Sequence, residues 1–168
     1  MKPKTAAYWI EKLNLIEHPE GGYFREIYRS AEAIQGEHLP KRFTGPRAFS
    51  TSIYYLLEGD DFSSFHRLKA DEVWHFYSGC PLTIYSINLQ GILSQIILGS
   101  DLAQGEVFQA VVPAGSWFAA TPNESHSYTL AGCAVSPGFE MDDFELGKRG
   151  ALVKKFPQHK QLIERFTR

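Results

Sequence analysis

The spacing of apolar and polar positions divides the chain into three parts. Near the N-terminus, four apolar side chains recur at spacings of three and four: Ala6, Trp9, Ile10 and Leu13. This period places them on one face of a helix, which we predict over residues 5–14. Pro19 and the glycines after it end that helix, and residues 23–28 have the composition of a strand. Residues 30–49 are polar and contain Gly and Pro, which indicates a long surface loop or flap.

The middle of the chain consists of short runs with strand composition, separated by turn residues such as Gly, Pro, Asp and Ser. The runs cover residues 51–57, 62–68, 72–77, 82–88, 92–98, 107–112, 116–120 and 127–135. A regular spacing of roughly ten residues is typical of a β-sandwich or a barrel. No helix-forming stretch lies between the runs, which excludes a parallel sheet built from strand–helix–strand units. We therefore predict an all-β body.

After Gly138 the pattern becomes that of helices. Two stretches of helix-forming residues follow, over 142–155 and 158–166. Pro157 suits the start of the second stretch, and we expect these short helices to close one side of the barrel. Because the sequence shows no internal repeat and no linker, we predict a single domain over residues 1–168. Its barrel core would cover about 20–140 and its helical segment about 141–168.

Composition and charge narrow the classes of function. Aromatic residues make up 14% of the chain, which favours a β-rich body. With 17 basic and 19 acidic residues and no block of like charge, we expect no binding to nucleic acid. No uncharged apolar run reaches the roughly 18 residues of a membrane span, and no secretory signal is visible. We therefore expect a cytoplasmic protein without membrane association, with Cys80 and Cys133 as reduced thiols.

Residues 65–79 concentrate side chains that carry chemistry. The segment resembles the first motif of the cupin superfamily, in which two histidines one residue apart, a glutamate and a later glycine form a metal site inside a small barrel. His66, Glu72 and Gly79 match this motif. Leu68 stands where the second histidine is expected. The resemblance therefore implies an incomplete set of metal ligands.

A second segment is similar to the second cupin motif. It contains Pro113 and Gly115 at the expected spacing, and Phe118 occupies the position of the last metal ligand. Of the four usual protein ligands, His66 and Glu72 remain. A catalytic metal commonly takes three or more protein ligands. We therefore expect no cofactor, apart from a weakly or adventitiously bound divalent metal.

The resemblance extends beyond these two motifs. The matching segments are residues 18–26, 53–57, 65–69, 71–77, 112–115, 137–139 and 143–146. Together they are similar to the cupin-5 family, formerly a domain of unknown function, over roughly residues 8–147. Membership would imply a double-stranded β-helix, the cupin jelly-roll barrel, with a pocket inside and pairing into dimers. It does not imply an established reaction.

His66 and Glu72 are the candidate catalytic residues. Without a metal they would form a proton-transfer pair, because imidazole titrates near neutral pH and an adjacent carboxylate orients it. Similarity to metal-independent sugar epimerases of the cupin fold would make His66 the general base of an isomerase or epimerase. Two alternatives remain open. The pair is structural, or it belongs to a metal site to which His126 contributes a third ligand.

Strand alternation predicts which side chains surround this pair. If His66 and Glu72 face the barrel interior, so do Ser64, Trp74, Phe76 and Phe118. Val73, His75 and Tyr77 then face outward. Such a pocket, polar at one end and aromatic elsewhere, suits a small ligand with an apolar part and a few polar groups. In the alternative interpretation the aromatic rings only fill the barrel.

Tyr23 and Arg25 share a face of the first predicted strand and complete the set of candidate ligand-binding residues. Arg25 would contact a ligand carboxylate or phosphate, or pair with an acidic neighbour such as Glu26. We predict a protein that binds a small, partly polar metabolite and acts as a metal-independent isomerase or epimerase. A non-catalytic ligand-binding or sensor module is the alternative. The outward apolar side chains and the family resemblance both predict a homodimer.

Overall fold

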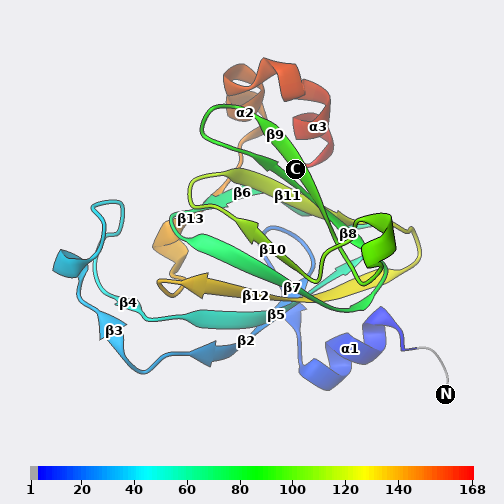
Figure 1. Ribbon diagram of the computed structural model, residues 1–168, viewed down its shortest axis with the longest axis horizontal. Coiled ribbons are helices and arrows are strands. Elements are labelled where there is room, and N and C mark those ends of the chain that lie inside the picture. Colours follow the sequence, from blue (N-terminus) through cyan, green and yellow to red (C-terminus); the bar gives the residue numbers. More distant parts are fainter. Residues whose placement is uncertain (1–3) are drawn as a thin grey trace.

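Two antiparallel sheets face each other in the computed structural model, which describes residues 4–168 (Figure 1). The first sheet has six strands in the order β1 (Ile16–Glu17), β2 (Tyr23–Arg29), β5 (Thr51–Glu58), β12 (Tyr128–Ser136), β7 (Asp71–Gly79) and β10 (Gln109–Val112). The second has five strands in the order β13 (Phe144–Leu146), β6 (Ser63–Leu68), β11 (Trp117–Pro122), β8 (Leu82–Ile87) and β9 (Leu93–Leu98). This arrangement confirms the predicted all-β jelly-roll fold. Each of the predicted middle strands is present, with bounds shifted by one or two residues.

Strand register decides which side chains form the core between the sheets. Trp74 on β7 lies opposite Cys133 on β12 and Ala110 on β10, and all three are buried in the largest apolar cluster. On the five-stranded sheet, Phe118 of β11 lies opposite His66 of β6, and both are buried. On β7, Glu72, Trp74 and Phe76 point into the barrel, as the alternation predicted. On β6 a β-bulge between Ser63 and His66 shifts the alternation, so that Ser63 faces the interior in place of Ser64.

Helix α1 (Ala6–Leu13) covers one end of the outer face of the six-stranded sheet (Figure 1). It begins after Thr5, whose hydroxyl accepts a hydrogen bond from a backbone N–H of the first turn. It ends at Asn14, which adopts the left-handed conformation common after a helix. The apolar side of the helix packs against Leu56 and Leu130. The helix predicted at the N-terminus is confirmed.

Helices α2 (Arg149–Lys155) and α3 (Lys160–Arg165) cover the outer face of the five-stranded sheet. Their apolar side chains form a second cluster with the outward residues of β6, β8 and β11: Phe65, Ile87, Trp117 and Ala119. The prediction of a helix over 142–155 was wrong in its first half. Residues 144–146 form β13 instead, which pairs with β6 and satisfies the backbone groups of that edge.

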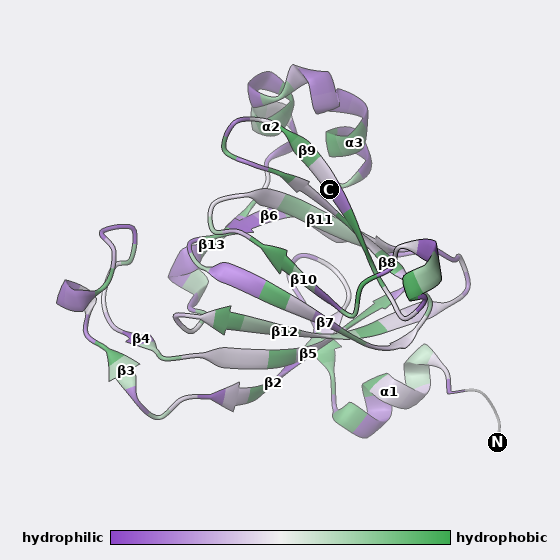
Figure 2. Ribbon diagram, viewed as in Figure 1, coloured by the Kyte–Doolittle hydropathy of each residue, from purple (hydrophilic) through white to green (hydrophobic). Residues whose placement is uncertain are grey.

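The predicted flap, residues 30–49, extends away from the barrel (Figure 1). It contains β3 (Ala33–Ile34) and β4 (Arg47–Ala48), which pair with each other, and its tip at η1 (Gly36–His38) is hydrophilic (Figure 2). Arg47 anchors the flap through two hydrogen bonds to the carboxylate of Asp143, at 2.6 and 2.7 Å. Both side chains are buried, with exposed fractions of 3% and 4%. Among residues 4–168, no helix combines the length and apolar character that spanning a membrane requires.

The buried ion pair of the flap generates a stability prediction. The variant Asp143→Ala leaves the Arg47 guanidinium buried without its carboxylate, and we expect it to lower the free energy of unfolding by about 3–5 kcal/mol. The control is Glu145→Ala, which breaks the half-exposed pair with Arg67 and is expected to cost about 0–1 kcal/mol. Urea denaturation of both variants provides the measurement. Equal losses in the two variants would contradict the anchoring role of Asp143.

Candidate functional site

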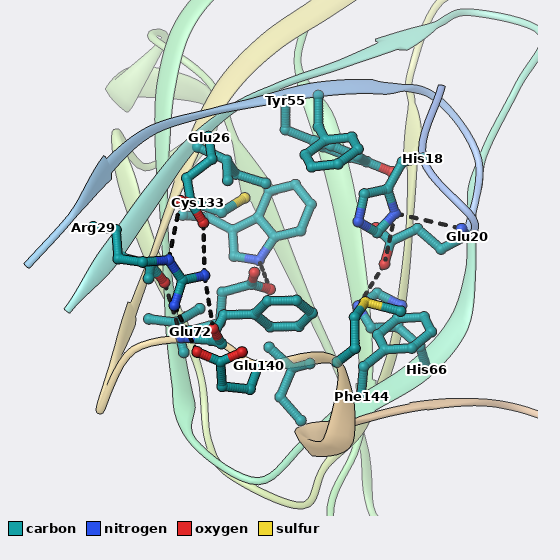
Figure 3. A pocket seen from close by; sticks show the side chains of 18 residues that line it. His18, Glu20, Glu26, Arg29, Tyr55, His66, Glu72, Cys133, Glu140 and Phe144 are labelled. Carbon is teal, nitrogen blue, oxygen red and sulfur yellow. Dashed lines mark hydrogen bonds and ion pairs between the residues drawn. The ribbon is translucent and has the colours of Figure 1, made fainter. Parts of the chain in front are cut away.

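A cavity of about 260 Å³ lies between the two sheets (Figure 3). Side chains from β2, β5, β7 and β12 form one wall, and β6, β13 and the segments before β2 and after β12 form the other. Aromatic rings supply much of the lining: Phe24, Tyr55, Trp74, Phe139 and Phe144. Polar groups occur at the buried end, in the middle and at the exposed end. The cavity is therefore apolar with a few convergent polar groups, as binding sites for small molecules are.

The buried end of the cavity holds a carboxylate between two imidazoles (Figure 3). Glu20 Oε2 lies 3.1 Å from Nε2 of His66 and 3.5 Å from Nδ1 of His18. The other oxygen, Oε1, accepts a hydrogen bond from the hydroxyl of Ser63 at 2.8 Å. Nδ1 of His66 lies 2.8 Å from the carbonyl oxygen of Ser64, so this nitrogen must carry a proton and donate. Both nitrogens of His66 are thus engaged by oxygen atoms.

The loop that brings Glu20 into the barrel depends on two glycines. Gly21 and Gly22 have φ angles of +117° and +71°, which residues with a side chain rarely adopt. A Cβ atom on Gly21 would lie 2.2 Å from the carbonyl oxygen of Phe62. The hydroxyl of Tyr55 donates to the carbonyl of Gly21 at 2.8 Å, which fixes the loop to β5. The local sequence therefore determines where the Glu20 carboxylate lies.

His18, in the same loop, is neutral in this environment. Burial lowers its pKa, although the charge of Glu20 acts in the opposite direction. Nδ1 accepts a hydrogen bond from the backbone N–H of Glu20 at 3.4 Å, which leaves the proton on Nε2. The ring packs edge-on against Phe24, with 4.6 Å between the ring centroids. His18 therefore supplies a neutral imidazole to the cavity lining.

Glu72 occupies the middle of the cavity as a protonated acid. Burial, and secondarily the charge of Glu20, raise the pKa of Glu72 to about 8. The indole N–H of Trp74 donates to Oε2 at 2.8 Å and acts in the opposite direction. Burial likewise raises the pKa of the Cys133 thiol and of the Tyr55 hydroxyl well above their usual ranges. At neutral pH the middle of the cavity is thus uncharged.

The exposed end of the cavity is closed by an ion-pair cluster. Arg29 Nε and Nη2 donate to the two carboxylate oxygens of Glu26, at 3.1 and 2.8 Å. Nη1 donates to Glu140 at 2.7 Å, and Nη2 also reaches the carbonyl of Phe139 at 3.1 Å. This cluster connects β2 to the segment after β12 (Figure 3). Most N–H groups of the guanidinium are therefore already used.

The structure corrects the predicted pair of His66 and Glu72. Both side chains line the same cavity, but the carboxylate that contacts His66 is Glu20. Glu72 bonds instead to Trp74, two residues along the same strand. The reason is topological: His66 lies on the five-stranded sheet and Glu72 on the six-stranded sheet. The two groups therefore face the cavity from different walls.

Of the predicted pocket residues, Trp74 lines the cavity, whereas Phe118, Phe76 and Ser64 lie outside its lining. The prediction for Ser64 was wrong, because a β-bulge in β6 turns Ser63 to the interior in its place. Phe118 packs on the imidazole of His66, with ring centroids 4.0 Å apart, beneath the cavity lining. Phe76 packs against the main core cluster. The hydroxyl of Ser64 accepts a hydrogen bond from Arg168 at 2.7 Å. These three side chains support the site from outside the cavity lining.

Tyr23, Arg25 and His126 lie away from the cavity. Tyr23 packs in the cluster beneath α1, because it falls on the outer face of β2. Arg25, on the same face, donates to the carbonyl of Leu13 at 3.0 Å and is not part of the cavity lining. His126 is 89% exposed and pairs with Asp60 at 3.6 Å. It is therefore unable to complete a metal site with His66 and Glu72.

Several residues of the site were missed in the sequence. His18 and Glu20 lie in the segment 18–26 that carried the family resemblance, but the glycines there indicated only a turn. The available signal for Glu20 was its position three residues before Tyr23, where the first predicted strand begins. Arg29 and Glu140 are 111 positions apart, and their contact depends on tertiary structure alone.

Comparison with known proteins agrees with this geometry. Residues 7–147 match the model of Cupin_5, described as cupin superfamily (DUF985). The chain belongs to the Cupin_5 family. The uncharacterized protein YML079W of Saccharomyces cerevisiae is 32% identical over 150 residues, which cover 84% of this chain and 74% of the yeast protein.

Two solved structures are similar over nearly the full length. Protein SO0799 from Shewanella oneidensis has 43% identity and a TM-score of 0.89, covering 99% of both chains. A hypothetical protein from Leishmania major has 32% identity and a TM-score of 0.88, covering 98% of this chain and 99% of its own. The recognition of the cupin-5 pattern in the sequence is confirmed. Both structures share the fold of this chain, and their names state no activity.

The donor set does not fit a metal site of the cupin type. Leu68 and Phe118 replace two ligand positions of the cupin motifs, and Glu20 already holds His66. Among residues 4–168, no three His, Cys, Asp or Glu side chains are arranged to bind a metal ion together. Two donors on opposite walls give too few bonds to offset the desolvation of a divalent ion. We therefore derive the chemistry of this Cupin_5 site from its own side chains.

We expect the purified protein to hold much less than one equivalent of tightly bound transition metal. The physical reason is the loss of donors at Leu68 and Phe118. Elemental analysis after dialysis measures the content. The variant Leu68→His, which restores one donor of the motif, serves as the comparison and is expected to retain more metal. A stoichiometric metal in the parent protein that persists against mild chelation would contradict the expectation.

Proposed function

We propose that this cupin binds a small, partly polar metabolite in the cavity between its sheets. Three features support the proposal. The volume of about 260 Å³ suits a small molecule, the aromatic walls suit an apolar or flat part, and Glu72 and His18 offer polar contacts. In addition, hydrogen bonds hold the loop that carries Glu20 in place before any ligand binds. A preformed site lowers the entropic cost of binding.

We further propose that the bound molecule undergoes metal-independent proton transfer, as in an isomerase or epimerase. The observation that carries this proposal is the placement of Glu72 and of the His66–Glu20 pair on opposite walls of one cavity, where burial raises the pKa of Glu72 to about 8. Because both ring nitrogens of His66 already have oxygen partners, the proton that the ligand loses goes to the carboxylate of Glu20, which His66 orients; the ligand gains one proton from Glu72, so the proton count balances. Acid–base catalysis requires one group that gives a proton and another that accepts one, so the two groups must differ in protonation state.

The test begins with identification of a ligand. Native mass spectrometry of the purified protein reports any molecule that co-purifies. A panel of aldoses, ketoses and small amino compounds is then incubated with the protein in D₂O, and proton NMR follows exchange at carbon. We expect exchange on at least one compound and a loss of about 10²-fold or more in Glu72→Gln. Binding without exchange would show a non-catalytic ligand-binding module instead.

Stability measurements separate the functional role of Glu72 from a structural one. Because the folded pKa is raised above the unfolded value near 4.5, the folded state binds more protons, and its stability falls as the pH rises from 4.5 to 8. The slope from this group is about 1.4 kcal/mol per pH unit at most. Glu72→Gln keeps an oxygen for the Trp74 N–H and is expected to remove this slope at little cost.

His66→Asn is the matched variant on the opposite wall. It takes from Glu20 one of its buried hydrogen-bond partners, and we expect it to cost about 1–3 kcal/mol. Thermal melts between pH 5 and pH 8 measure both variants. A large loss of melting temperature in Glu72→Gln, with unchanged ligand binding, would show that Glu72 is only structural.

We also propose that a second copy of the chain covers the free part of the six-stranded sheet. Helix α1 covers one end of the outer face, whereas Tyr77 on β7 and Val111 on β10 remain 48% and 51% exposed. Val111 lies opposite Val73 in register, and the ring of Tyr77 lies over Gly132 and packs edge-on against Tyr54 on the same outer face. Apolar side chains gathered on one sheet face are typical of protein interfaces.

Light scattering tests this proposal. The parent protein is expected to give twice the monomer mass of 19.0 kDa at micromolar concentration. The double variant Tyr77→Asp with Val111→Asp places charge on the proposed interface and is expected to be monomeric. Leu89→Asp, at an exposed apolar position in another part of the surface, is the control and is expected to remain a dimer. A monomeric parent would contradict the proposal.

A further inference from the structure

The charged side chains that line the cavity are unequal in sign. Among residues 4–168 they comprise the carboxylates of Glu20, Glu26 and Glu140 and the guanidinium of Arg29, and Glu72 adds a fourth negative charge when it loses its proton. Arg29 already binds two of these carboxylates and a backbone carbonyl. A ligand anion entering the cavity therefore meets an occupied guanidinium and unfavourable charge from the surrounding acids. The electrostatic environment favours a ligand that brings positive charge.

The aromatic lining favours the same kind of ligand. The rings of Tyr55 and Trp74 pack edge to face, with centroids 5.5 Å apart, beside the carboxyl group of Glu72. The face of an aromatic ring attracts a cation, most strongly where water is excluded. The rings of Phe24, Phe139 and Phe144 also line the cavity and would contact an apolar body attached to that cation.

Glu72 has a carboxyl oxygen that is free to bind a cationic group of a ligand. Oε2 accepts the hydrogen bond from Trp74, while Oε1 makes no hydrogen bond with the part of the chain that the structure describes. Glu20 is bound by His66 and Ser63, and Glu26 and Glu140 are bound by Arg29. The carboxyl group available to a ligand is therefore that of Glu72.

We infer that the ligand is a small organic cation, with an amine or related basic nitrogen that binds Oε1 of Glu72 and an apolar body held among the aromatic rings. This inference rests on the proposed function insofar as the cavity is taken as the ligand site. It deepens that proposal, because the basic nitrogen is the group that accepts the proton of Glu72. When the nitrogen arrives already protonated, Glu72 releases its proton to water and an ammonium–carboxylate pair forms.

The inference gives binding a definite dependence on pH. Since the pKa of Glu72 is about 8 in the free protein, the ionised form that pairs with a cation becomes more abundant as the pH rises towards 8. Of the neighbouring titratable groups, burial lowers the pKa of His18 and raises the pKa values of Tyr55 and Cys133, so burial disfavours the charged form of all three. His66 and Glu20 bond to each other, and Arg29 bonds to Glu26 and Glu140.

The experiment compares three probes of nearly equal shape: benzylamine, benzyl alcohol and benzoate. Isothermal titration calorimetry at pH 6, 7 and 8 gives their affinities for the full chain. We expect benzylamine to bind at least tenfold more tightly than benzyl alcohol at pH 8, and benzoate to bind more weakly than either. The affinity for benzylamine is expected to rise about tenfold per pH unit between pH 6 and pH 7. Titrations in buffers with different ionisation enthalpies should show release of about one proton.

Two variants complete the design. In Glu72→Gln we expect the affinity for benzylamine to fall to that for benzyl alcohol and its pH dependence to disappear. Glu58→Gln, an exposed glutamate at the end of β5, is the control and should behave as the parent. Benzylamine that binds no more tightly than benzyl alcohol, or fails to bind, overturns the inference. The proposed proton transfer is tested separately, by exchange on the compound panel in D₂O. Its outcome therefore does not depend on the calorimetric result for benzylamine.

Discussion

The site depends on how carboxyl groups are kept inside an aromatic barrel. Burying a carboxylate is costly unless hydrogen bonds or a counter-charge replace water. The protein meets this constraint in three ways. Glu20 is bound by Ser63 and His66, Asp143 is paired with Arg47, and Glu72 retains its proton. The three solutions produce three different groups: a hydrogen-bonded carboxylate, a structural ion pair and a neutral acid.

The position of Glu20 couples distant parts of the chain. Its backbone carbonyl accepts hydrogen bonds from the backbone N–H of Ser64 and from Arg168, at 2.8 and 2.6 Å. Arg168 also contacts Asp61, whose second oxygen accepts from the N–H of Gly22. The residue that follows the C-terminal helices thus holds the loop that precedes β2. A helical layer that lies outside the barrel thereby contributes to the geometry of the cavity.

The sequence predicted what depends on local pattern. The alternation along residues 63–79 was enough to place His66, Glu72 and Trp74 inside the barrel, because side chains on a strand point to opposite faces in turn. The partners of these groups depend on which strands meet, and no pattern along one strand contains that information. The pairing of His66 with Glu20 and the strand at residues 144–146 are contacts of this kind.

Replacing metal ligands by apolar residues changes the chemistry that the remaining ligands are able to perform. With Leu68 and Phe118 at two motif positions, His66 packs against the ring of Phe118 and turns its Nε2 to Glu20. Glu72, left on the opposite wall, stays protonated because burial and the charge of Glu20 raise its pKa. A metal would hold both groups deprotonated in one coordination sphere. Without it, the two walls differ in charge and protonation, and this difference across the cavity is the basis for acid–base action on a bound molecule.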